Sequence, residues 1–354
     1  MILRQFRQRR LTNQLLTSPV EDPARVIARL GAVQAQDYLG ALWAVGQRTR
    51  SVTEGEVEQA LADRRIVRTW PMRGTLHIVA AADVRWMLEL CTPRIVKRLA
   101  LRHAREYGLD EAAFARGREV LIRALEGGKS LTRPAVYQIL ETAGITVAGQ
   151  AGVHLLWRLS QEGLICFGAR AGKQQTFVLL DEWVPGGRKF SRDEALAELA
   201  GRYFTGHGPA TLADFVWWSG LPVADARAGL RMVENQFERA VIDGETFWLS
   251  SEPARRKSRT PIAHLLPPFD EYLVGYKDRN AVLDPRFAGR LSALLSPAVE
   301  LEGQVVGTWG RRLIKGGVEL AFRPFGRLDP TQSNAVDRAA QRYAAFLGRE
   351  IMAG

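Results

Sequence analysis

The chain has 354 residues, with 49 lysines and arginines against 38 acidic residues and a formal net charge of +11. A hydrophobic content of 46% and a charged content of 25% are typical of globular domains and exclude a disordered or low-complexity protein. No long uncharged apolar run predicts a membrane span, and Cys91 and Cys166 alone exclude a disulfide framework. We therefore expect a protein of the cytoplasm.

The positive charge is concentrated at the start of the chain. Residues 1–100 hold sixteen arginines and lysines against nine acidic residues, a surplus of seven out of the eleven for the whole chain. Most of these residues are arginines, whose planar guanidinium suits recognition of phosphate. The bias indicates a polyanionic partner, and we expect nucleic acid; a basic solvated surface is the alternative.

A pattern of helices followed by a two-stranded hairpin, typical of a winged helix, is predicted three times along the chain. The first copy, in residues 1–105, begins with a helix capped at Ser18–Glu21 and ends with wing strands at Val67–Met72 and Thr75–Val79. The second copy occupies residues 106–188. Its helices are expected at 111–125, 135–143 and 149–161, and its wing strands at 164–167 and 176–179.

The third copy, in residues 189–257, carries the clearest local signals. Ser191 and Glu194 form a capping box, Thr211 caps the next helix, and Asp243-Gly244 predicts the turn of the hairpin. Three tryptophans are expected in the core of this copy: Trp217, Trp218 and Trp248.

Residues 258–354 are predicted to form a small antiparallel β region. Short strands are expected at 299–302, 304–309, 311–315 and 318–322, with a turn at Gly316-Gly317 and a closing helix at 334–347. The sequence thus predicts an α+β fold of three tandem winged-helix units in an arc. The C-terminal β region contributes a hairpin and the terminal helix.

Metal and cofactor chemistry finds no support in the sequence. The five histidines, at 77, 103, 154, 207 and 264, are not paired at a ligand spacing, and the two cysteines lie far apart. Phosphate-loop, dinucleotide-binding and nucleophile-elbow motifs are also missing from the sequence. We therefore expect neither a metal nor a cofactor.

Two glutamines separated by one residue follow the first predicted helix, in Gln34-Ala35-Gln36-Asp37-Tyr38. In a continuing helix, their side chains would project about 200° apart and could not serve one site. If Gly31 ends that helix, an extended stretch would place both amides on one side. The alternative is that these polar residues are capping or solvated.

Several motifs together resemble the helix-turn-helix DNA glycosylases of the AlkZ/YcaQ type. The resemblance covers essentially the whole chain in the same order. It is carried by Gln34-Ala35-Gln36, Arg73-Gly74-Thr75-Leu76-His77, Phe269-Asp270-Glu271-Tyr272-Leu273, Gly275-Tyr276-Lys277-Asp278-Arg279 and Val306-Gly307-Thr308-Trp309. It implies tandem winged helices around a basic surface for duplex DNA. Gln34 and Gln36 match the catalytic glutamines of the branch that has glutamine at both positions.

The resemblance also implies a C-terminal β-hairpin needed for activity, which we map to Trp309–Lys315. Asp37 is a second candidate for a catalytic or orienting role, and its alternative is a helix cap or a partner for arginine. His77 is expected to be buried and hydrogen-bonded. The residues expected to contact DNA are Arg68, Arg73, Trp309, Arg311, Arg312 and Lys315.

The resemblance implies a monomeric, monofunctional DNA glycosylase that acts on bulky cationic N7-alkylpurines in double-stranded DNA, interstrand crosslinks included. Its role would be base excision repair or self-resistance to DNA-alkylating antibiotics. Two alternatives stay open. One is a non-catalytic winged-helix regulator or damage sensor, which would usually dimerise to bind paired half-sites. The other is an accessory factor that sequesters damaged DNA without cutting it.

Overall fold

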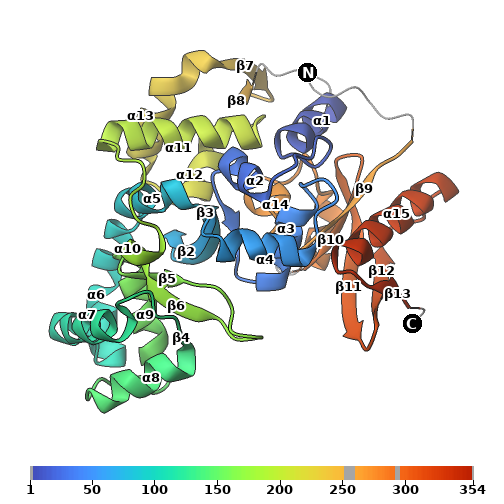
Figure 1. Cartoon of the computed structure of the whole chain (residues 1–354). Helices are drawn as coiled ribbons and strands as arrows, with labels where there is room; N and C mark the ends of the chain where they lie inside the picture. Colours follow the sequence, from blue (N-terminus) through green and yellow to red (C-terminus); the bar gives the residue numbers. More distant parts are fainter. Residues whose placement is uncertain (1–2, 251–259, 292–295, 353–354) are drawn as a thin grey trace. The chain divides into compact units, whose positions relative to one another are not determined.

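The computed structural model describes residues 3–250, 260–291 and 296–352 (Figure 1). The chain forms two compact units, one of Met1–Val57 with Leu196–Gly354 and one of Glu58–Ala195. The four segments expected from the sequence divide the chain differently, and their boundary at 257/258 lies outside the described residues. That division stays a prediction.

The chain begins with short helices around one very short strand. These elements are α1 (Leu3–Asn13), α2 (Pro23–Leu30), β1 (Val33–Gln34), α3 (Tyr38–Gly46) and α4 (Glu54–Ala62). Asp22 caps α2 by accepting a hydrogen bond from the Ala24 amide at 3.0 Å, and Gly31 ends it with a φ of 79°. Gly31 therefore meets the condition that the sequence analysis set for an extended stretch after this helix. The cap expected at Ser18–Glu21 is wrong, because Asp22 supplies the capping oxygen and Pro23 is the first helical residue. Helix α1, which the sequence did not predict, buries Phe6 and Leu11.

The third predicted winged helix is present in the structure. It consists of α11 (Arg192–His207), α12 (Leu212–Ser219), α13 (Val223–Val233), the 3-10 turn η2 (Glu234–Gln236) and the hairpin of β7 (Phe237–Ile242) with β8 (Glu245–Ser250). Thr211 and Asp214 form a capping box, and Asp243 and Gly244 both have positive φ, as the hairpin turn requires. Both signals were predicted correctly.

One tryptophan of this winged helix lies where the sequence did not place it. Trp218 is fully buried, but Trp217 is 44% exposed. The Trp217 indole donates a hydrogen bond to the Val274 carbonyl at 3.1 Å, at the edge of the core. The core position predicted for Trp217 is therefore wrong, because adjacent residues of a helix project about 100° apart and only one of the pair can point inward.

The unit of Glu58–Ala195 combines helices with the sheet order β3-β2-β5-β6-β4. Its elements are β2 (Ile66–Met72), β3 (Thr75–Ala80), η1 (Ala81–Asp83), α5 (Val84–Cys91), α6 (Pro93–Tyr107), α7 (Glu111–Leu125), β4 (Leu131–Thr132), α8 (Arg133–Thr142), α9 (Ala151–Gln161), β5 (Ile165–Phe167), β6 (Thr176–Leu179) and α10 (Leu180–Trp183). Both predicted wings are present as β2–β3 and β5–β6. Helices α5 and α6 were not predicted.

A buried histidine in this unit, His103, is expected to lower the stability of the folded protein in acid. His103 is fully buried, with its ring 5.1 Å from that of His154, and burial together with the charges of His154, Arg158 and Arg102 lowers its pKa to about 4. The unfolded chain binds this proton near pH 6.5, whereas the folded chain resists it. The contribution of neutral His103 to stability is therefore complete above pH 6.5 and is lost as the pH falls toward 4.

We expect His103→Phe to reduce the pH dependence of thermal unfolding between pH 6.5 and 4, relative to the wild type. Melting curves of both proteins, followed by circular dichroism across this range, measure the difference. Equal pH dependence in the two proteins would show that His103 does not contribute to the loss of stability in acid.

The C-terminal part forms an antiparallel sheet with one parallel edge strand, in the order β13-β12-β11-β10-β9, with helix α15 alongside (Figure 1). Its elements are β9 (Ala263–Leu266), α14 (Glu271–Val274), η3 (Pro285–Arg290), β10 (Ala298–Leu301), β11 (Gln304–Ile314), β12 (Gly317–Pro324), α15 (Pro330–Phe346) and β13 (Glu350–Ile351). The separate strands expected at 304–309 and 311–315 are wrong. They form one strand because Gly310 pairs with Ala321 without interrupting the register.

The α+β class and the antiparallel sheets predicted from the sequence are confirmed. The arrangement of the winged helices in an arc stays a prediction. None of the helices in the described residues is both long and apolar enough to cross a lipid bilayer.

Candidate functional site

The two glutamines follow the end of α2 as the sequence predicted. After Gly31 the chain is extended through β1, and it bends at Gln36 before α3 begins. Gln34 is 8% exposed, whereas Gln36 is exposed. A Cβ at Gly31 would lie 3.3 Å from the Trp218 ring, so glycine serves here both for its positive φ and for close packing. That both amides serve one reacting sugar stays a prediction.

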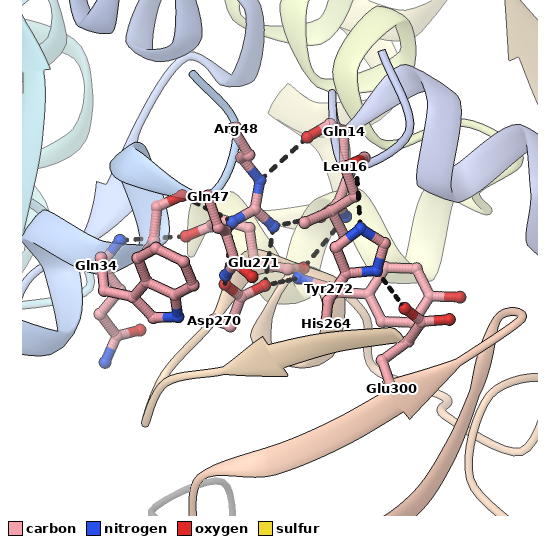
Figure 2. A network of polar contacts seen from close by, with 12 residues as sticks. Gln14, Leu16, Gln34, Gln47, Arg48, His264, Asp270, Glu271, Tyr272 and Glu300 are labelled. Carbon is pink, nitrogen blue, oxygen red and sulfur yellow. Dashed lines mark hydrogen bonds and ion pairs between the residues drawn. The ribbon is translucent and has the colours of Figure 1, made fainter. Parts of the chain in front are cut away.

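A buried carboxylate holds the backbone of Gln34. Glu271, the first residue of α14, is fully buried, and its Oε1 accepts a hydrogen bond from the Gln34 amide at 3.0 Å. The Gln34 side chain points away from this network (Figure 2). The side-chain amide of Gln34 thus lies apart from the Glu271 carboxylate, which binds the backbone N–H of Gln34.

A fully buried ion pair lies beside Glu271. Arg48 binds Asp270 through two hydrogen bonds, from Nη2 to Oδ1 at 2.7 Å and from Nη1 to Oδ2 at 2.8 Å (Figure 2). Neither side chain is exposed. Gln14 accepts from Arg48, and Gln47 donates to Asp270 at 3.0 Å. Sequence reasoning missed Arg48 and Gln14. The Asp270-Glu271 pair of the family motif is the signal that pointed to this region.

Asp37 has both of the non-catalytic roles that the sequence left open. Its Oδ1 caps α3 by accepting a hydrogen bond from the Gly40 amide at 2.9 Å, and the same oxygen lies 4.0 Å from Nη2 of Arg311. Arg311 also donates a hydrogen bond to the Tyr343 hydroxyl. The start of the C-terminal hairpin is therefore connected to the residue that follows Gln36.

The other hairpin residues predicted to contact DNA differ in exposure. Trp309 is only 7% exposed, donates its indole hydrogen to the Leu266 carbonyl at 2.8 Å and packs edge-on against Tyr343. This burial argues against a direct DNA contact by Trp309, because the indole fills the core of the sheet, and its role as a DNA contact stays untested. Arg312 pairs with Glu319 at the surface, and Lys315 is exposed at the turn. DNA contacts by Arg311, Arg312 and Lys315 stay predictions.

In the unit of Glu58–Ala195, both arginines predicted to contact DNA bind other side chains of the same unit. Arg68 is 6% exposed, donates to Gln175 Oε1 at 3.1 Å and lies over the Phe167 ring. This burial argues against a direct phosphate contact by Arg68, whose role as a DNA contact stays untested.

His77 is buried, as predicted, and orients Arg73. Its Nδ1 lies 2.9 Å from the Thr75 carbonyl, and its Nε2 lies 3.1 Å from Arg73 Nη2. Because a carbonyl only accepts, Nδ1 carries the proton and Nε2 accepts from the guanidinium. A neutral His77 thus holds Arg73 at the turn of the wing, and DNA contact by Arg73 stays a prediction.

No group of three or more potential metal ligands occurs within residues 3–250, 260–291 and 296–352. The two cysteines are also unsuited to nucleophilic catalysis. Burial raises the pKa of the Cys91 thiol to about 12 and raises the pKa of the Cys166 thiol as well.

Winged-helix hairpins, a surplus of arginine and two glutamines after α2, the first held through its backbone by the buried Glu271, are features expected of an α+β protein that acts on DNA. The chain belongs to the AlkZ-like DNA glycosylase family, whose model matches residues 27–346. The family predicted from the motifs is thus confirmed, and with it the class of enzyme, a hydrolase of N-glycosyl bonds.

One relative and one solved structure that the chain resembles come from Streptomyces sahachiroi. The curated relative, an interstrand DNA cross-link repair glycosylase, is 26% identical over 361 residues, which cover 96% of this chain and 95% of the relative. The solved structure of the DNA glycosylase AlkZ from the same organism superposes with a TM-score of 0.80. It covers 99% of this chain and 98% of that one at 24% identity, which establishes a common fold.

Proposed function

We propose that this glycosylase hydrolyses the N-glycosidic bond of bulky, cationic N7-alkylpurines in duplex DNA and unhooks interstrand crosslinks. The observation that carries the proposal is the pair of neutral glutamines after α2, with the backbone of the first anchored on Glu271. The relative from S. sahachiroi is named for crosslink repair, which supports the choice of substrate. We further propose that the protein acts as a monomer in the cytoplasm.

Neutral amides suit a substrate that already carries positive charge. An amide is neither an acid nor a base at neutral pH, so Gln34 and Gln36 cannot protonate a leaving base or deprotonate water. An N7-alkylated guanine needs no such help, since it leaves as a neutral base. Its departure creates an oxocarbenium-like sugar, a cation that oriented carbonyl dipoles stabilise.

The same two amides can also place the water that completes the reaction. A carbonyl oxygen accepts a hydrogen bond from water and so holds it against the sugar without proton transfer in the ground state. This mechanism leaves ordinary, uncharged bases intact, because nothing in it activates a neutral leaving group.

The test is incubation of the purified protein with a duplex that carries one N7-alkylguanine, followed by alkaline cleavage of the abasic site. We expect cleavage at the modified position and none in the unmodified duplex. Binding without any cleavage would favour the non-catalytic damage sensor. A second duplex, with an N7–N7 interstrand crosslink, should be converted to separable strands.

A further inference from the structure

Glu271 is a fully enclosed acidic side chain that contacts the glutamine motif. It is fully buried, and Figure 2 shows its contact with the backbone of Gln34. Oε1 accepts from the Gln34 amide at 3.0 Å, while Oε2 accepts from Trp218 Nε1 at 2.9 Å and lies 3.1 Å from His207 Nε2. Burial of a carboxylate costs free energy unless such donors replace its water, so these contacts fix the position of the Glu271 carboxylate.

We propose that Glu271 is a positioning residue for Gln34. This proposal rests on the proposed function, in which the side-chain amide of Gln34 acts on the sugar. Glu271 itself cannot contact DNA, because it is fully buried and its carboxylate oxygens face protein donors. It acts through the backbone, since the side chain of Gln34 points away from it.

The donors on the far side of Glu271 are themselves fixed. His207 stacks on Tyr203 at 4.7 Å with an interplanar angle of 14°, and the Trp218 ring is fully buried. The carboxylate therefore links the rigid third winged helix to the short strand β1. This link adds to the rigidity that orientation of a catalytic side chain requires.

The backbone of α14 is fixed from both ends. Asp270 is locked by Arg48, and Gln14 Nε2 donates to the Glu271 carbonyl at 3.2 Å. A Cβ at Gly275 would lie 2.5 Å from the Glu271 carbonyl oxygen and 2.7 Å from His207 Cδ2, so the helix end is packed tightly. The position of the carboxylate thus follows from the packing around it.

Glu271→Gln is the sharpest variant, because it keeps the shape and replaces one acceptor by an NH2 donor. That donor meets another N–H group, from Gln34 or Trp218, whichever way the amide turns. We expect the single-turnover rate of base release to fall on the order of 10–100-fold, as for a slightly misplaced catalytic group, with the Kd for DNA nearly unchanged.

A double-mutant cycle separates positioning from a merely structural role. If Glu271 acts through Gln34, then adding Glu271→Gln to Gln34→Ala should leave the single-turnover rate at that of Gln34→Ala alone. Independent losses that multiply would overturn the proposal. Trp218→Phe is the matched control, because it removes one donor to the same carboxylate but keeps the hydrogen bond from the backbone N–H of Gln34 to Glu271. We expect it to retain more activity than Glu271→Gln.

Hydrogen exchange of the backbone N–H of Gln34 reports on its hydrogen bond to Glu271 without a measurement of activity. In the wild type, we expect this amide to be protected, and in Glu271→Gln to exchange faster than in Trp218→Phe. Exchange in the folded wild type as fast as for an open amide would overturn the proposal even if Glu271→Gln failed to fold. A wild type that releases no base would overturn the proposed function, whereas an active wild type with an equally active Glu271→Gln variant would overturn only this inference.

Discussion

Replacing Gln34 and Gln36 together with alanine should abolish release of an N7-alkylated base while the protein still binds DNA. Each amide is proposed to stabilise the sugar cation or to hold water, and loss of one preorganised group of this kind costs about 10²–10³ in rate. The single-turnover rate on a duplex with one N7-alkylguanine measures the effect. Affinity for the same duplex should change little, because phosphate contacts supply most of it.

Gln341→Ala is the control, since Gln341 is an exposed glutamine of α15. This variant should cleave at the rate of the wild type. Full activity in the double variant would leave a DNA glycosylase whose catalytic groups lie elsewhere, with Asp37 as the next residue to replace.

Arg48→Met should reduce the free energy of unfolding by about 3–5 kcal/mol, because it leaves the carboxylate of Asp270 buried and unpaired. Both side chains are fully buried and joined by two short hydrogen bonds, so water cannot replace the lost guanidinium. Denaturant titration followed by circular dichroism measures the loss.

The double variant Arg48→Met, Asp270→Leu tests the physical reason. Removing both charges removes the unpaired carboxylate, so this protein should be more stable than Arg48→Met alone. A double variant less stable than the single one would mean that the polar contacts of Asp270 with Gln47 and its own helix outweigh the buried charge.

Local signals allowed much of the fold to be predicted from the sequence. The capping residue Thr211 fixes the start of α12, and the Asp243-Gly244 turn fixes the hairpin of the third winged helix, because each acts on its nearest neighbours. The break at Gly31 is likewise signalled by the backbone freedom of one residue. Each of these signals can be recognised in the sequence without knowledge of what packs around it.

The supporting network could not be predicted, because it depends on contacts between distant parts of the chain. Arg48 and Asp270 are 222 residues apart, and Gln34 and Glu271 are 237 residues apart. The burial of Trp309 depends in the same way on the sheet around it and on Tyr343. Helix α1 was missed because four of its eleven residues are arginines, and the burial of Arg10 depends on a distant partner, the Pro209 carbonyl.

The division of the chain into units has a consequence for biosynthesis. Residues 58–195 form one uninterrupted unit and can fold while the ribosome is still making the rest. The glutamines belong to the other unit, where Trp43 waits for Tyr343 and Phe346 of α15 to pack against it. The packing around Trp43, in the unit that holds Gln34 and Gln36, is therefore completed only after α15 has been synthesised.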